Sequence, residues 1–379
     1  MKATNEMKNN TTASLLSIGQ LGRYELPTRM IMAPMTRMRA HGDGVPSDMM
    51  VTYYSQRACA ALIISEATAV SAQGVGYMNA PRLYTEEHVR GWARVTSAVH
   101  ARGGRIFVQL FHAGRISHPS LLPGTGLPVA PSAIRPKGRV HTPEGRVPYV
   151  TPRCVTDEEI PRLVDEFKVA AQLAAAAGFD GAEIHAANGY LLDQFLRNGA
   201  NHRQAPYGGS PKNRARFLTE VADAVASVLG AGSTGVRLSP LHRFNDMSDS
   251  EPRETFTTAV KALDKLGLAY LHLVEKDDAP LVGPRFELSR LRALWSSALV
   301  VNEDYDRVRA AAALARGADF ISFGKLFIAN PDLPRRFLAD ARLNSPRSDS
   351  FYGGDSQGYI DYPFLSADDG ASSCEAQSA

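Results

Sequence analysis

The chain has 379 residues, with 42 Lys and Arg against 39 Asp and Glu, which gives a formal net charge of +3. So small an excess argues against nucleic acid or an anionic membrane as a partner. Hydrophobic residues make up 44% of the chain and charged residues 21%, the composition of a globular protein with a sizeable core. Three cysteines, Cys59, Cys154 and Cys374, show no metal-ligand spacing. We therefore expect neither a disulfide framework nor a metal or iron–sulfur centre.

Both ends of the chain are polar, and we expect them to be disordered. Residues 1–14 are rich in Asn, Thr and Lys, and residues 366–379 in Ser, Asp, Ala and Gly, so neither end has much to bury. The start lacks the apolar segment of a secretion signal, and no run approaches the length of a membrane span. The sequence thus predicts a cytoplasmic protein, a monomer or homodimer, folded as one domain over residues 15–365 with no membrane or nucleic-acid partner.

Between the ends, short apolar runs alternate with helical patterns. The runs are nearly continuous in Val, Ile, Leu and Phe, as in parallel strands covered on both faces. The expected strands are 29–33, 62–65, 105–110, 180–184, 235–239, 269–274, 298–301 and 319–323. The expected helices are 48–61, 86–101, 157–177, 211–229, 252–266, 288–296 and 305–315, with a last one starting near Pro331. Eight strand–helix repeats predict an α/β fold, the (β/α)8 TIM barrel.

A doubly wound open sheet is the alternative fold, but it usually has a Gly-rich nucleotide turn after its first strand. Here the first strand is followed by residues 33–37, Ala-Pro-Met-Thr-Arg, with no glycine, which favours the barrel. The connection after the third strand, residues 112–156, is too long for a plain turn and contains a hairpin pattern at 139–149. Loops of this length usually form lids or binding loops, so we expect a lid there.

Polar side chains follow the expected strands, at the end of a barrel where enzymes keep their catalytic groups. They are Thr36, Glu66, Gln109, His185, Arg237, Glu275, Asn302 and Lys325. An arginine in a strand is costly to bury without an anion, so Arg237 favours a binding role. A buried Gln109 needs partners for both ends of its amide, which a planar heterocycle would provide. Gly324 and Lys325 follow the eighth strand, where barrels commonly bind phosphate.

The densest polar cluster follows the fourth strand, where His185, Asn188 and Tyr190 lie within six positions. Two donors suited to holding an oxygen and a phenol suited to giving up a proton form a chemically coherent set. A lone histidine is more often a core residue, but its two neighbours favour a site, and no local second ligand supports a metal. Tyr77 and Tyr352, in loops after the second and eighth strands, line a pocket or cover surface.

These stretches resemble the old yellow enzyme family of FMN-dependent NAD(P)H ene reductases. The matching segments are 33–39, 65–68, 107–110, 112–115, 181–195, 201–203, 207–210, 236–240, 244–247, 302–305, 328–332, 351–352 and 358–362, so the likeness covers essentially the whole expected fold. The resemblance implies one (β/α)8 barrel with FMN across its C-terminal mouth, reduced by NADPH or NADH. It also implies hydride transfer from flavin N5 to the activated C=C bond of an α,β-unsaturated carbonyl or nitro compound.

The resemblance assigns roles residue by residue. His185 and Asn188 would hold the substrate oxygen, and Tyr190 would protonate the α-carbon. The substrate pocket would also include Tyr77, Phe111 and Tyr352. The residues that would bind FMN are Pro34, Met35, Thr36, Ala67, Gln109, Arg237, Asn302, Gly324 and Lys325.

Three positions depart from the family pattern. Lys325 stands where Arg is usual, Phe111 where Trp is often found, and Leu241-His242-Arg243 where the family has a small Gly-containing turn. The departures leave the natural substrate and the choice between NADH and NADPH open. A nitrate-ester or nitroaromatic reductase would use the same flavin, and it would use the same pair, His185 and Asn188 (the oxygen clamp), to hold the substrate oxygen. A phosphate-substrate isomerase or aldolase barrel would instead need a catalytic lysine or carboxylate base at the mouth. A non-catalytic flavin-binding protein would bind the cofactor but would not turn over substrate.

Overall fold

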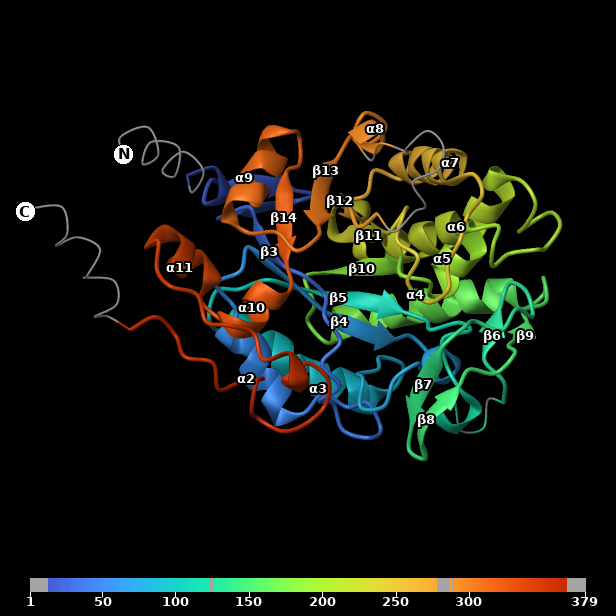
Figure 1. Cartoon of the computed structure of the whole chain (residues 1–379), viewed down its shortest axis with the longest axis horizontal. Helices are drawn as coiled ribbons and strands as arrows, with labels where there is room; N and C mark the ends of the chain where they lie inside the picture. The colour runs from blue at the N-terminus through green and yellow to red at the C-terminus, as the bar shows by residue number, and fades with distance from the viewer. Residues whose placement is uncertain (1–12, 123, 125, 278–286, 288, 367–379) are drawn as a thin grey trace, which may run out of the picture.

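The structure, a computed structural model, describes residues 13–122, 124, 126–277, 287 and 289–366. At its centre eight parallel strands form a closed barrel (Figure 1). In chain order they are β3 (Met30–Met32), β4 (Leu62–Ala69), β5 (Ile106–Phe111), β10 (Gly181–Ala186), β11 (Thr234–Leu238), β12 (Tyr270–Val274), β13 (Ala298–Asn302) and β14 (Phe320–Phe323). Each strand pairs with the next, and β14 pairs with β3 to close the ring. The predicted barrel and all eight of its strands are confirmed.

Helices surround the barrel because each presents one apolar stripe to the outer face of the strands. The long ones are α2 (Asp48–Gln56), α3 (Glu86–His100), α4 (Ile160–Ala176), α6 (Pro211–Leu229), α7 (Pro252–Asp264) and α9 (Arg307–Ala315). Shorter ones are α5 (Leu191–Leu196), α8 (Ser289–Arg292), α10 (Lys325–Ala329), α11 (Leu333–Leu338) and the 3-10 turns η1 (Ala72–Gly74), η2 (Pro119–Leu121), η3 (Ala231–Ser233) and η4 (Ser348–Ser350). Side-chain caps by Ser47, Thr85 and Ser210 fix the starts of α2, α3 and α6.

A short hairpin of β1 (Gly19–Leu21) and β2 (Tyr24–Leu26) covers the N-terminal end of the barrel, and the sequence did not predict it. Leu21 and Leu26 are fully buried in one cluster with the barrel residues Phe107 and Tyr270. Strands of three residues are too short to show an alternating pattern, which is why this hairpin was missed. Its position leaves the opposite, C-terminal end of the barrel open.

The long connection after β5 contains two small sheets. The strands β6 (Val129–Ala130) and β9 (Arg153–Cys154) pair in parallel, and β7 (Arg139–Thr142) with β8 (Gly145–Pro148) forms an antiparallel hairpin. This hairpin extends away from the barrel in Figure 1, and it lies within the predicted hairpin pattern at 139–149. Residues of the hairpin face the cavity described below, but its role as a lid stays a prediction.

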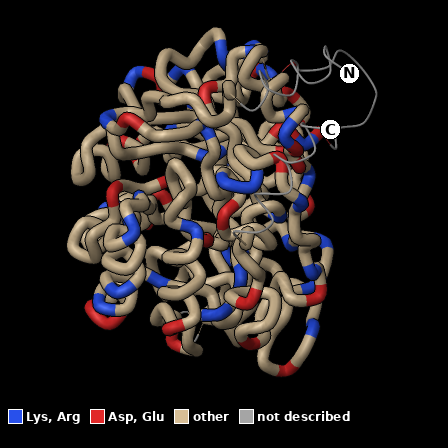
Figure 2. The backbone as a smooth tube through the Cα atoms, turned by 90° about the vertical axis from the view of Figure 1, so that its left-hand side faces the viewer, with Lys and Arg blue, Asp and Glu red and all other residues tan. Residues whose placement is uncertain are grey.

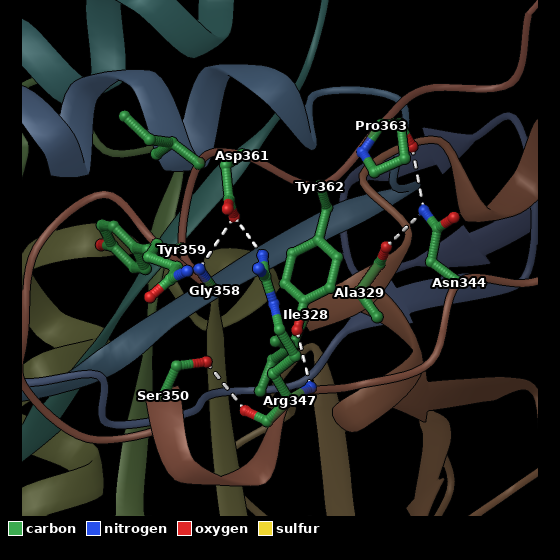
Figure 3. Close-up of polar contacts among 12 residues, drawn as sticks. Ile328, Ala329, Asn344, Arg347, Ser350, Gly358, Tyr359, Asp361, Tyr362 and Pro363 are labelled. Carbon is green, nitrogen blue, oxygen red and sulfur yellow. Dashed lines mark hydrogen bonds and ion pairs between the residues drawn. The ribbon is translucent and has the colours of Figure 1, made fainter.

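Residues 344–365 form an extended C-terminal strap across the ends of the last barrel units. Figure 3 shows the Asn344 amide nitrogen donating to the backbone oxygen of Ala329, at 2.8 Å. It also shows Arg347 paired with the Asp361 carboxylate within the strap. The strap has no helix or strand of its own beyond one 3-10 turn, so these side-chain contacts set its course.

Two buried arginines after β3 hold the strap from the barrel side. Arg37 Nε donates to the Phe351 carbonyl at 2.8 Å and Arg37 Nη2 donates to the Gly358 carbonyl at 2.9 Å. Arg39 donates to further strap carbonyls. A guanidinium with five donors suits a segment whose backbone oxygens lack sheet partners. The result is that Phe351 and Tyr352 are fixed beside the loop that carries Thr36.

Lys and Arg are interspersed with Asp and Glu over the face seen in Figure 2. Among the described residues, no helix is both long enough and apolar enough to cross a membrane. Residues 13–15, at the predicted boundary of the folded part, are helical, and Leu15 is buried. The rest of the predicted disorder falls on residues 1–12 and 367–379, which lie outside the described part of the chain.

Candidate active site

A cavity of about 780 Å³ opens at the C-terminal end of the barrel, within the size range of small-molecule sites. Its walls come mainly from the ends of the barrel strands and the loops that follow them, the place where barrels carry their chemistry. Of the predicted site residues, it brings together Pro34, Met35, Thr36, Ala67, Tyr77, Gln109, His185, Asn188, Tyr190, Arg237, Asn302, Gly324, Lys325 and Tyr352.

His185 lies on β10 and Asn188 follows two residues after the end of this strand, and both side chains line the cavity. Burial, helped by the nearby charge of Arg237, lowers the pKa of His185 to about 3, so its imidazole is neutral at physiological pH. Its Nδ1 is buried without a hydrogen-bond partner in the described structure, an arrangement that a ligand oxygen would relieve. Asn188 has a φ of 58°, a left-handed conformation that asparagine tolerates better than most residues.

The lowered pKa of His185 makes protein stability depend on pH. Its folded pKa of about 3 lies below the ordinary value of 6.5, so the unfolded chain binds more protons between those values. Stability therefore falls as the pH drops below 6.5, by ~2 kcal/mol at pH 5 from this residue. Urea unfolding at pH 7 and pH 5 measures the loss, and a His185→Asn variant should show a smaller one. Equal losses in the two proteins would remove His185 as the cause.

Tyr190 is the N-cap residue of α5, and its side chain lines the cavity beside His185. Its hydroxyl lies 2.7 Å from that of Tyr77, and its ring packs edge-on against Phe111 at 4.5 Å and against His185 at 5.0 Å. Burial raises the pKa of Tyr190 to about 12, partly offset by the hydrogen bond with Tyr77. The phenol therefore keeps its proton at neutral pH and can act as an acid. Phe111 packs against the rings of Tyr190 and Tyr77 and is not among the residues that line the cavity, and its predicted substrate contact stays a prediction.

Arg237 lines the cavity next to His185, on the neighbouring strand β11. Its Nη2 donates to Asn302 Oδ1 at 2.8 Å, and Asn302 in turn donates to the Ser322 carbonyl at 2.9 Å. The Nε and Nη1 atoms of Arg237 are buried with no hydrogen-bond partner among the described residues. A buried cation with two unused donors is costly unless a ligand supplies oxygen or negative charge. The residue thus marks a binding site for an electron-rich group.

Residues 18–344 match the NADH:flavin oxidoreductase / NADH oxidase family. The chain belongs to this family. It is 40% identical to 12-oxophytodienoate reductase 1 of Oryza sativa subsp. japonica over 358 residues, 93% of each protein. A solved structure of the old yellow enzyme homologue from Zymomonas mobilis has a TM-score of 0.89 and 43% identity, covering 93% of this chain and all of that one. Morphinone reductase in complex with tetrahydroNAD has a TM-score of 0.89 and 45% identity, covering 94% of this chain and 98% of that one.

These comparisons confirm the predicted old yellow enzyme family and its (β/α)8 barrel. They also confirm an oxidoreductase that uses FMN and a nicotinamide reductant. The cavity fits the cofactor, because the unused donors of Arg237 suit an electron-rich flavin edge. The predicted phosphate residue, Lys325, is more than half exposed at the cavity rim, and its Nζ lies 2.9 Å from Asp304 Oδ1.

The sequence did not identify Glu183, a buried carboxylate of this flavin oxidoreductase that has three side-chain partners. It lies on β10, is fully buried, and accepts from Gln109 Nε2 at 2.7 Å and from Tyr270 OH at 3.0 Å. Its Oε2 also lies 2.7 Å from His272 Nδ1. A carboxylate inside an otherwise apolar strand, Gly-Ala-Glu-Ile, was the available signal.

The charge state of Glu183 follows from its neighbours. Burial acts to raise the pKa of Glu183, but His272 and Arg237 outweigh it and hold that pKa below its usual value. Burial lowers the pKa of His272, and the Arg237 guanidinium is a second basic group that acts on Glu183. Arg237 thus lines the cavity beside a fixed anion.

Two predicted strand-end carboxylates lie outside the cavity wall. Glu66 is buried and accepts from the Arg37 backbone N–H at 3.0 Å and from Tyr54 OH at 3.2 Å, so it holds the loop after β3. Glu275 accepts from Tyr305 OH. Cavity residues that the sequence did not single out come from the hairpin, from later loops and from the strap: Arg139, Val140, His141, Tyr149, Phe244, Lys276 and Phe351.

Proposed function

We propose that this enzyme reduces the activated C=C bond of α,β-unsaturated carbonyl or nitro compounds, with Tyr190 as the proton donor. The observation that carries the proposal is one cavity in which His185 and Asn188, two oxygen-binding side chains, stand beside a protonated phenol. FMN, when bound, would supply the hydride, and NADPH or NADH would reduce it again. The names of the relatives, 12-oxophytodienoate reductase and morphinone reductase, support an enone as the substrate.

The clamp activates the substrate by hydrogen bonding. Neutral His185 and the amide of Asn188 each donate to the substrate oxygen, which draws electron density from the β-carbon and prepares it to accept hydride. Both donors are uncharged, so the oxygen is polarised without being protonated first. Tyr190 then gives its proton to the α-carbon, and the hydroxyl of Tyr77, 2.7 Å away, stabilises the phenolate that remains.

The remaining cavity residues bind the cofactor in this proposal. Arg237, Gln109 and Thr36 would hold the flavin, with the Arg237 cation stabilising negative charge on it. Lys325 takes the phosphate in exchange for Asp304, as a point charge in place of the bidentate fork of an arginine. The backbone of residues 34 and 35 together with Ala67, Asn302 and Gly324 completes the surface, and Tyr352 covers the mouth. The cytoplasmic location and the choice between monomer and homodimer stay predictions.

Tyr77→Phe tests the hydrogen bond between the hydroxyls of Tyr77 and Tyr190. We expect reoxidation of the reduced enzyme by an enone to slow about tenfold, because the Tyr190 phenolate loses its hydrogen-bond donor. Flavin reduction by NAD(P)H should be unchanged. Stopped-flow measurement of each half-reaction separates the two. An unaltered reoxidation rate would mean that Tyr77 only packs against Tyr190.

The proposed function is tested by the colour of the protein and its cycle. Purified enzyme should be yellow, bleach with NADPH or NADH under anaerobic conditions, and recover its colour when 2-cyclohexenone is added. Recovery with a nitrate ester or nitroaromatic compound but with no enone would assign the alternative xenobiotic reductase. A colourless protein that takes up no FMN would exclude both, and would reopen the isomerase or aldolase interpretation.

A further inference from the structure

The loop after β11, residues 239–247, holds Asn188 from three directions. The Asn188 backbone N–H donates to Ser239 Oγ at 2.7 Å, and its carbonyl accepts from Asn245 Nδ2 at 2.8 Å. The third contact is to the side chain, where His242 Nδ1 lies 3.2 Å from Asn188 Oδ1. The first two contacts fix the backbone in its left-handed turn. The third acts on the amide that faces the substrate.

His242 is itself held in place. Its carbonyl accepts from Arg197 Nη1 at 3.0 Å, and Arg197 forms a buried ion pair with Asp193, with Nε 2.7 Å from Oδ1. Asp193 also accepts from the Gly189 backbone N–H at 2.8 Å, which ties the same network back to the turn that carries Asn188. The imidazole stacks on the ring of Phe244 with centroids 5.6 Å apart and planes at 17°. Its half-buried ring lies outside the cavity lining, so any effect on the substrate is indirect.

The contact decides which end of the Asn188 amide is presented. Oδ1 can only accept, so His242 Nδ1 must carry the proton in this contact. The amide NH2 group is then left to donate to the substrate oxygen. In the flipped amide, NH2 would bond to His242 and Oδ1 would meet the substrate oxygen. Two acceptors would then face each other, and the clamp would lose one of its two donors.

We propose that His242 is a positioning residue that locks the Asn188 amide with its NH2 group toward the substrate. The enzyme thereby favours substrates that present an acceptor oxygen. This inference rests on the proposed function and deepens it, since it assigns a specificity role to a residue that touches neither substrate nor cofactor.

The test combines His242→Phe, His242→Gln and Asn188→Ala. Phenylalanine keeps a flat ring against Phe244 but has no donor, so kcat/KM for 2-cyclohexenone should fall about tenfold, mainly through KM. Glutamine offers an amide N–H and should recover part of that loss. Cyclohexanone, which presents the same oxygen but has no C=C bond to reduce, should show a matching rise in its competitive inhibition constant. The control is His202→Phe, an exposed histidine outside the cavity lining, which should behave as wild type.

The decisive comparison is the double variant. If His242 acts through Asn188, then His242→Phe should cause no further loss in the Asn188→Ala background. Losses that multiply, or a His242→Phe variant equal to wild type, would overturn the positioning role while leaving enone reduction intact. Should His242→Phe fail to fold, His242→Gln gives the same comparison through its partial effect. A wild-type enzyme that bleaches with NAD(P)H but that no enone reoxidises would overturn the proposed function, and this inference with it.

Discussion

Replacing Tyr190 by Phe should slow enone reduction by about 100- to 1,000-fold, the usual contribution of a positioned general acid. The phenylalanine ring retains the packing against Phe111 and His185, so the clamp and the cavity keep their shape. Reduction of the flavin by NAD(P)H involves no proton from Tyr190 and should stay near the wild-type rate. Stopped-flow absorbance of the flavin, following each half-reaction alone, measures both effects.

A tyrosine outside the cavity provides the control for this variant. Tyr84→Phe removes a hydroxyl that accepts from Arg82 Nη1 at 3.3 Å and should leave both half-reactions within about twofold of wild type. An equal loss in both half-reactions of Tyr190→Phe would point to a disturbed cavity. Unchanged enone reduction would assign the proton to another donor, with Tyr77 the nearest candidate.

The barrel was predictable because its strands are buried on both sides. Near-continuous apolar runs such as 106–110 cannot serve an exposed surface, and their regular alternation with helices leaves few topologies. The errors occur where a segment is too short to carry a period. The hairpin of β1 and β2, the six-residue helix α5 and the five-residue helix α10 all fall in this class. Their positions are set by contacts with the finished barrel.

The site could be predicted to the extent that it follows strand ends. His185 and Arg237 are register partners on the neighbouring strands β10 and β11, so their proximity follows from the topology of the barrel. Glu183 could not be found in this way. Its main partner, His272, lies on β12, two strands away in the barrel. The two side chains meet only because the sheet closes into a barrel and both point into its interior. His242 was visible as a bulky departure, but its contact with Asn188 depends on the course of a loop.

Glu183→Ala should produce the largest loss of stability, about 3–5 kcal/mol in the free energy of unfolding. The change removes the acceptor shared by Gln109, Tyr270 and His272, and it leaves the Arg237 cation buried without its anion. Glu183→Gln keeps the shape and one acceptor oxygen, so it should cost less, about 1–3 kcal/mol. Urea unfolding of the three proteins at pH 7 measures the difference.

The same carboxylate should also influence the redox properties of the flavin. Loss of its negative charge leaves Arg237 more positive toward the cavity, which favours added negative charge on the cofactor, so the midpoint potential of FMN in Glu183→Gln should rise. Glu66→Gln is the matched control, because Glu66 is equally buried but holds the loop after β3 and is not among the charges that act on Arg237. Spectroelectrochemical titration should show a shift in the first variant and none in the second. Equal shifts would mean that any lost buried carboxylate changes the potential, and no shift in either would mean that Glu183 only supports the fold.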